Sequence, residues 1–178
     1  MRRARTENIA WLFAVILSAC LLGGTAGSAD SSRPPRTVVD FYMLLPRGNF
    51  EVPRRDLLAP HWPHVVDVRN GYLHVRGGGA QNDLTVCIFK RPAGSYLVAL
   101  SNNNFTSGGD WHPTLRFFSY RRGRLVDVTR AALPRHFSSA LGYKLPRYGR
   151  TIRVITPEGR TVYSMDWADG SFNVTRAG

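Results

Sequence analysis

The residues best suited to metal chemistry are histidines in the first half of the chain. His61, His64 and Asp67 follow one another three residues apart, and His74 lies further on. A zinc site needs three or four such ligands to converge, and two residues three apart share a face on a helix. Pro63 stands between the two histidines and removes the backbone donor that a helix needs there. We therefore expect surface histidines, with no metal and no other cofactor.

Residue types used in nucleophilic catalysis are present, but they do not form a catalytic pattern. Cys87 lies in the apolar run 84–89, where nothing nearby would lower the pKa of its thiol, so we expect a buried structural cysteine. The chain has no Gly-x-Ser-x-Gly elbow and no evident pair of catalytic carboxylates. The glycine run 77–79 lacks the Lys-Ser/Thr of a phosphate-binding loop. The sequence favours a non-enzymatic protein, and the alternative is a secreted hydrolase whose residues converge from separate strands.

The polar stretch 101–113 is the first candidate for ligand binding. It combines amide side chains with aromatic and imidazole rings, and its binding candidates are Asn103, Trp111 and His112. Long loops on a β scaffold often carry function, and an exposed indole can stack on the apolar face of a sugar ring. In the alternative interpretation, Trp111 and Phe105 anchor the loop to the core, because aromatic side chains are usually buried.

The chain is strongly basic, with 24 Lys and Arg residues against 12 Asp and Glu residues and a formal net charge of +12. Two of these charges belong to the first 29 residues, which leaves +10 for the rest. Such a balance favours an anionic partner. Arg121, Arg122 and Arg124 form a cluster at an expected hairpin tip, where guanidinium groups can bind phosphate or carboxylate groups. An ordinary solvated turn is the alternative.

The first 29 residues have the layout of a secretory signal peptide. Three arginines precede the uncharged apolar run 9–22, and the small residues 23–29 lead to Asp30. The apolar run is shorter than the roughly 20 residues that span a bilayer. Cleavage after Ala29 would release a soluble protein.

A second processing site lies inside the same leader. Leu17-Ser18-Ala19-Cys20 resembles the lipobox of bacterial lipoproteins. The resemblance implies cleavage before Cys20, lipidation of its thiol and attachment to a membrane. Both alternatives stay open, with a leader of residues 1–29 or, in a lipoprotein, of residues 1–19.

Export by such a leader limits which anionic partners this basic protein can meet. We expect an exported protein of the periplasm or cell envelope, either soluble or held to a membrane only by a lipid on Cys20. The partners that fit this location are an anionic envelope component, a glycan or an envelope protein. Nucleic acid is not expected there. The sequence therefore predicts a non-enzymatic binding or structural module of the cell envelope.

The pattern predicts one β-rich domain over residues 37–178, after a polar linker at 30–36. Tyr163, Met165 and Trp167 alternate with polar residues, as on a strand with one buried face. We expect about eight or nine strands in an antiparallel meander, either a barrel or a sandwich, with one or two short helices. The strands are expected at 65–68, 72–76, 84–90, 95–101, 114–120, 124–128, 151–156, 160–167 and 171–175.

Helices are expected at three places. Residues 37–45 have apolar side chains at helical spacing, Thr37 can cap the start and Pro46 ends the run. The same run is rich in β-branched and aromatic residues, so a strand is the alternative. One further helical turn is expected within 52–58, and a short helix within 129–141.

The dipeptide Asn70-Gly71 is the clearest turn signal in the chain. It separates the apolar runs 65–68 and 72–76. Asn-Gly between two such runs is typical of a two-residue hairpin turn in which both residues take positive φ. We therefore expect a tight hairpin here, with both residues in the left-handed region.

Three segments resemble parts of uncharacterised exported bacterial proteins of similar length. They are 40–46 (Asp-Phe-Tyr-Met-Leu-Leu-Pro), 67–73 (Asp-Val-Arg-Asn-Gly-Tyr-Leu) and 145–149 (Leu-Pro-Arg-Tyr-Gly). The resemblance spans most of the chain after the leader. It implies a single exported domain, and it transfers no activity and no site residue.

Overall fold

The computed structural model describes residues 33–77, 83–103 and 111–178. The leader with both processing sites, the glycines at 78 and 79 and Phe105 lie outside these residues. Residues 33–178 form one compact unit. In the described part of the chain, no helix is long and apolar enough to span a membrane.

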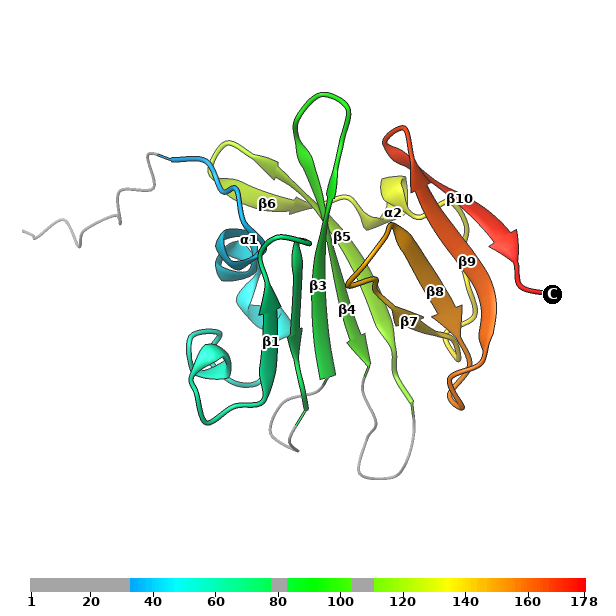
Figure 1. Ribbon diagram of the computed structural model, residues 1–178, viewed down its shortest axis with the longest axis horizontal. Coiled ribbons are helices and arrows are strands. Elements are labelled where there is room, and N and C mark those ends of the chain that lie inside the picture. The colour runs from blue at the N-terminus through cyan, green and yellow to red at the C-terminus, as the bar shows by residue number, and fades with distance from the viewer. Residues whose placement is uncertain (1–32, 78–82, 104–110) are drawn as a thin grey trace, which may run out of the picture. The chain divides into compact units, whose positions relative to one another are not determined.

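The described residues form ten strands, somewhat more than expected, and they lie in two antiparallel sheets (Figure 1). One sheet has the order β1-β2-β3-β4-β5-β6 and the other the order β10-β9-β8-β7, so neighbouring strands follow one another along the chain. The strands do not close into a barrel, and the sandwich alternative is confirmed. The strands are β1 (His64–Asp67), β2 (Tyr72–Val75), β3 (Asp83–Lys90), β4 (Tyr96–Asn103), β5 (Thr114–Arg121), β6 (Arg124–Asp127), β7 (Gly142–Lys144), β8 (Thr151–Ile155), β9 (Thr161–Ala168) and β10 (Ser171–Arg176).

The central strands β3, β4 and β5 are apolar on both faces, because each face covers a separate core. Alternate residues point to opposite faces of a strand, so Leu97 and Phe117 enter the core between the two sheets, while Val98 and Phe118 enter the core under α1 (Val38–Leu44). The result is three layers, with α1 and the four-stranded sheet on opposite faces of the six-stranded sheet (Figure 1). Full burial of one such side chain stabilises the fold by about 1.5–3 kcal/mol.

The first helix, α1, forms as predicted, and the strand alternative for this segment was wrong. The Thr37 hydroxyl accepts a hydrogen bond from the Asp40 backbone N–H, and the Asp40 carboxylate accepts one from the Thr37 backbone N–H. This reciprocal capping satisfies donors that a helix start leaves unpaired. Phe41 and Tyr42 are buried, and Pro46 follows the last turn. The short 3-10 helices η1 (Arg47–Asn49) and η2 (Asp56–Leu58) come next.

The short helix expected within 129–141 forms as α2, which covers only Thr129–Ala132. Leu133 comes next and is extended, because the following Pro134 restricts the residue before it to extended conformations. The chain then forms β7 at Gly142–Lys144, which pairs with β8 and was not predicted as a strand. A strand of three residues is too short to show the alternation from which strands are predicted.

The Asn70-Gly71 turn differs from the predicted two-residue hairpin. Asp67 pairs with Tyr72, so four residues connect β1 and β2, and only Gly71 has positive φ, at 65°. The Asp67 carboxylate accepts hydrogen bonds from the Asn70 backbone N–H and side-chain amide, at 3.1 and 2.9 Å. These bonds hold Asn70 outside the left-handed region, because an Asp side chain can close a turn of its own.

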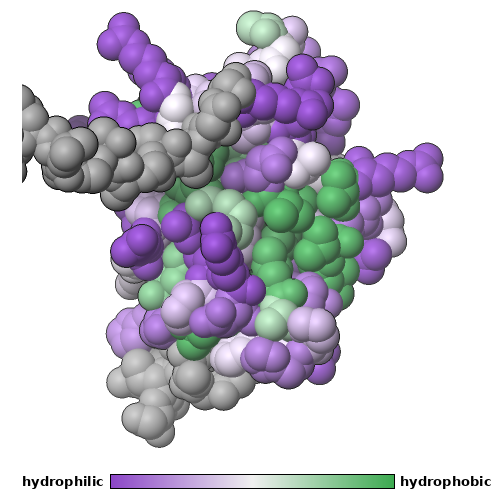
Figure 2. Space-filling view, turned by 90° about the vertical axis from the view of Figure 1, so that its left-hand side faces the viewer, coloured by the Kyte–Doolittle hydropathy of each residue, from purple (hydrophilic) through white to green (hydrophobic). Residues whose placement is uncertain are grey.

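Strand β1 forms one edge of the six-stranded sheet and carries exposed apolar side chains. Val65 and Val66 of β1 are 37 and 39% exposed, and Val68 in the turn that follows is 51% exposed. Figure 2 views the molecule from the side of α1 and β1 and shows an apolar area surrounded by polar side chains. Strand pairing satisfies β1 on one side only, since β2 is its sole neighbour in the sheet.

Candidate functional site

The candidates in the 101–113 stretch lie at the ends of β4 and before β5, against β7. The Trp111 ring covers Gly142 so closely that a methyl group there would lie 2.4 Å from its Cζ2 atom. The Asn103 amide donates to the Tyr143 carbonyl oxygen at 3.4 Å. His112 is exposed. Trp111 and Asn103 thus meet over β7, and the position of Trp111 matches the anchor interpretation of this ring.

The three clustered arginines occupy the predicted hairpin tip, between β5 and β6. Arg122 and Gly123 form its turn, with φ of 49° and 83°. Arg121 and Arg124 lie directly opposite each other in the ladder, and all three arginines are exposed. Like charges placed opposite each other are destabilising. An anion bound between the two guanidinium groups would offset this repulsion.

The histidines are dispersed over β1, β2 and the loops. His64 contacts the Trp62 carbonyl through Nδ1 at 2.7 Å. His74 Nε2 lies 4.0 Å from an Asp83 oxygen, and burial lowers the pKa of His74 while Asp83 partly offsets this. Over residues 33–77, 83–103 and 111–178, no three His, Cys, Asp or Glu side chains are grouped as metal ligands.

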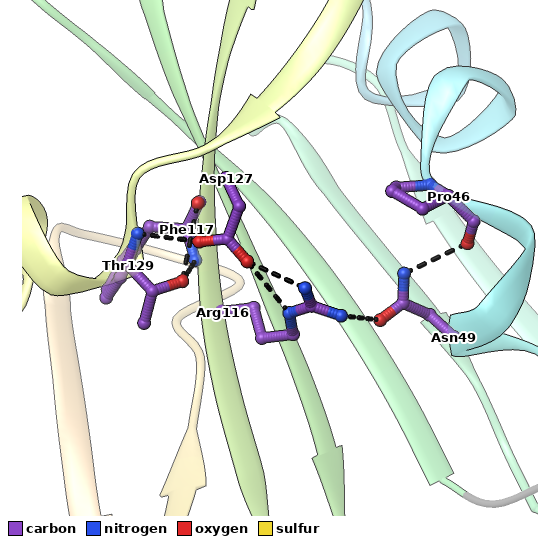
Figure 3. Close-up of polar contacts among 6 residues, drawn as sticks. All are labelled: Pro46, Asn49, Arg116, Phe117, Asp127 and Thr129. Atoms are coloured by element: carbon purple, nitrogen blue, oxygen red, sulfur yellow. Dashed lines mark hydrogen bonds and ion pairs between the residues drawn. The ribbon is translucent and has the colours of Figure 1, made fainter.

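Several polar side chains gather around Arg116, as they would in an active site, but they are hydrogen-bonded to one another (Figure 3). The Arg116 guanidinium donates to Asp127 at 2.7 Å and to the Asn49 side-chain oxygen at 2.9 Å. The other Asp127 oxygen accepts from the Thr129 backbone N–H at 2.8 Å. The network therefore connects η1 with β5, β6 and α2, and we assign it a structural role.

A hollow of about 900 Å³ lies beside η1 and η2. Its best-placed cation, Arg54, donates hydrogen bonds to the Met43 and Leu45 carbonyl oxygens at the end of α1. Glu51 and Asp56 also line the hollow and balance much of its arginine charge. Arg54 therefore closes the helix end, and this hollow has little net charge to attract an ionic ligand.

The strongest candidate site surrounds the loop between β7 and β8, which we call the 146–150 loop (Pro146 to Arg150). Three contacts fasten this loop to other strands. The Cys87 thiol donates to the Pro146 carbonyl oxygen at 3.1 Å, and the Trp167 backbone N–H donates to the Arg150 carbonyl oxygen at 3.1 Å. Arg147 Nε donates to Asp67 at 3.0 Å. Cys87 is thus a buried structural thiol, as predicted, and burial raises its pKa.

The first hollow beside the 146–150 loop has a volume of about 480 Å³ and contains three cations. Lys144 and Arg153 lie directly opposite each other on β7 and β8, and Arg147 closes the hollow from the loop. Tyr148 is 69% exposed, with the Arg147 guanidinium 5.3 Å from its ring centre. Ser164 also lines this hollow. Guanidinium and ammonium groups such as these can bind carboxylate or phosphate groups through charge-assisted hydrogen bonds.

The second hollow, of about 340 Å³, lies on the other side of Pro146 and is also basic. Its basic lining residues are Arg69 from the β1–β2 turn, Lys90 from the end of β3 and Arg150 from the loop. Trp167 forms part of its wall and donates from Nε1 to the Lys90 carbonyl oxygen at 3.2 Å. Six basic residues line the two hollows, and they come from five segments of the chain: β3, β7, β8, the β1–β2 turn and the 146–150 loop.

The carboxylates close to these cations are already hydrogen-bonded. Hydrogen bonds from Asn70 and Arg147 hold the pKa of Asp67 below its usual value. Asp166 accepts a hydrogen bond from the Thr151 hydroxyl at 2.6 Å. Among the described residues, Arg147 is the only one of the six cations in an ion pair. The surface therefore keeps a positive charge that neighbouring carboxylates do not neutralise.

Sequence reasoning did not find this site. The segment 145–149 was noted for its resemblance to exported proteins, but an Arg-Tyr pair next to a glycine has no specific meaning in a loop. The available signal was Tyr148, a large aromatic residue between Arg147 and Gly149 in a turn.

Comparison with known protein families, with curated proteins and with solved structures found no match.

Proposed function

We propose that this protein is an exported, non-enzymatic module of the cell envelope that binds an anionic partner at the two hollows beside the 146–150 loop. One observation carries the proposal. Six basic residues line the two hollows, and the nearby carboxylates Asp67 and Asp166 are already engaged in hydrogen bonds. Charge-assisted hydrogen bonds from Arg to carboxylate or phosphate groups are about twice as strong as neutral ones.

The first hollow favours a glycan over a small inorganic anion. Tyr148 presents most of its ring to solvent, and the Arg147 guanidinium lies over that ring. An exposed aromatic ring can stack on the apolar face of a sugar, and adjacent guanidinium groups can hold a sugar carboxylate. Lys144 and Arg153 add two more positively charged residues to the lining of this hollow.

The compartment is part of the proposal and rests on the leader. Processing after Ala29 would make the module soluble, and processing before Cys20 would attach it to a membrane by a lipid. In either form its partner is an anionic envelope component, a glycan or an envelope protein. A secreted hydrolase remains the alternative function.

The test is binding of an oligogalacturonate, a sugar chain with one carboxylate on each unit, measured by titration calorimetry. Arg150→Gln and Lys144→Gln each remove one cation from one hollow, and each should weaken binding several-fold. Tyr148→Ala should weaken binding further than Tyr148→Phe, because phenylalanine keeps the ring. Arg160→Gln is the matched control, since Arg160 is exposed at the β8–β9 turn outside both hollows.

The outcomes separate the candidate functions. Binding that is unchanged by Arg150→Gln, Lys144→Gln and Tyr148→Ala would reject this site, and absence of binding would reject the proposal for acidic glycans. Mass spectrometry of the sugar after incubation addresses the hydrolase alternative. Shortened chains would replace a binding function with an enzymatic one.

A further inference from the structure

A third basic hollow, of about 160 Å³, continues the first two along the surface. Arg91 and Arg121 line it, together with Trp167 and Gly170. The first and second hollows share Pro146, and the second and third share Trp167. Lys90 of the second hollow and Arg91 of the third are consecutive in the chain. The three hollows are therefore neighbours in series.

The connections that surround these hollows lie at one end of the sheets. The β1–β2, β3–β4, β5–β6 and β9–β10 turns and the 146–150 loop are all at the upper end in Figure 1. Their cations are Arg69, Lys90, Arg91, Arg121, Arg122, Arg124, Arg147 and Arg150. Two carboxylates accompany them in the described chain, Asp67 at the end of β1 and Asp169 in the β9–β10 turn. We call the three hollows and these turns the basic track.

We infer that the basic track binds a linear anionic polysaccharide, with one end in the first hollow and successive carboxylates along the second and third hollows. This inference rests on the proposed function and extends it from a single site to an extended one. A small anion can meet the cations of one hollow only. A chain with repeated charges can meet all three, and each added contact raises the effective concentration of the next.

The arrangement of like charges supports an extended ligand. Lys144 faces Arg153 in the first hollow, and Arg121 faces Arg124 at the other end of the track. Each pair is destabilising without an anion between its members. Anions at only one end would relieve only one pair, whereas a linear polyanion can neutralise both.

The aromatic residues distinguish a polysaccharide from a single-stranded nucleic acid. Proteins that bind single strands stack successive bases on a series of exposed aromatic rings. In the described part of the track, Tyr148 is exposed, but Trp167 is only 6% exposed and packs between the sheets. One exposed ring suits one stacked sugar, with charge contacts along the rest of the chain.

The test compares oligogalacturonates of increasing length, from the disaccharide to the dodecasaccharide, on the folded protein. The dissociation constant should fall by at least about tenfold with length and then reach a plateau when the track is filled. The plot of log affinity against log salt should be steeper for the dodecasaccharide, because more cations take part.

Variants at the two ends of the track should affect binding of the short and the long sugar differently. Lys144→Gln should weaken binding of both the short and the long sugar. Arg121→Gln with Arg122→Asn should weaken the dodecasaccharide several-fold and leave the disaccharide unchanged, and asparagine tolerates the positive φ at position 122. Arg160→Gln, outside the track, should change neither. Circular dichroism of each variant verifies that the fold is intact.

Each outcome bears on a defined part of the inference. If the disaccharide binds as tightly as the dodecasaccharide, the extended track is refuted and the single site stands. If the double variant at Arg121 and Arg122 binds the long sugar normally, the track does not reach the β5–β6 turn. Equal affinity for polyphosphate or single-stranded DNA of the same charge would refute sugar recognition. No binding of any sugar would refute the proposed function for acidic glycans, and the track with it.

Discussion

The contact between Trp111 and Gly142 gives a sharp test of how the end of the 101–113 stretch is held. A Cβ atom on Gly142 would lie 2.4 Å from Trp111 Cζ2 and 3.2 Å from Trp111 Cε2. Such distances are shorter than the optimal separation of non-bonded carbon atoms, about 3.5–4.0 Å. Gly142→Ala must therefore displace the indole ring, and Gly142 has no positive φ that would add backbone strain.

We expect Gly142→Ala to lower the free energy of unfolding by about 1–3 kcal/mol, the usual cost of overpacking. For a domain of this size each kcal/mol lowers Tm by about 3–4 °C. Thermal and chemical unfolding followed by circular dichroism measure both quantities. Gly48→Ala is the matched control, because a methyl group on Gly48 would meet no atom within 4 Å and Gly48 has no positive φ. It should leave stability unchanged or raise it slightly.

The double-mutant cycle decides whether the steric contact is the cause. In a Trp111→Leu background the ring is gone, so Gly142→Ala should then cost less than about 0.5 kcal/mol. Two results would contradict a steric contact between Trp111 and position 142: wild-type stability of Gly142→Ala, or the same loss of stability with and without the indole. Either would mean that Trp111 does not rest on β7, and the ring would again be a candidate binding platform.

Three further predictions concern stability and reactivity. Burial raises the pKa of Asp127, but hydrogen bonds from Thr129 and Arg116 outweigh it and lower the pKa. Asp127→Asn should therefore cost about 0.5–1 kcal/mol at neutral pH. That cost should shrink as the pH falls through the depressed pKa of the folded state, and denaturation curves that keep a constant difference would contradict this. A disulfide reagent should label Cys87 at least about a hundredfold faster in guanidinium than in the native protein, because burial raises the pKa of the Cys87 thiol. The Cys87→Ala variant measures the labelling of Cys20, which is subtracted. Met165→Ala, at a position with no exposed area, should cost about 2–5 kcal/mol in chemical denaturation, and a loss below about 1 kcal/mol would argue against the core between the sheets.

The spacing of apolar residues was sufficient to predict the helices and strands in which that spacing is regular. The strands from β3 to β6 and from β8 to β10 fall on the expected runs, and α1 starts at the predicted cap Thr37. Met165 and Trp167 are buried on one face of β9, as their alternation indicated. The pattern failed at β7, which has three residues, and at Asn70, where the Asp67 side chain set the turn.

Which charged residues lie together depends on packing between distant segments of the chain. Arg69, Lys90 and Arg150 line one hollow although up to 81 positions separate them in the chain. Spacing along the chain reports the period of one element and the face that it buries, and it contains no information about which loops meet. That meeting depends on two cores that stack β3 to β5 between α1 and the second sheet. Composition and local pattern specify a basic, β-rich chain with a predicted leader for export, whereas packing of the two cores sets where its positive charge is concentrated.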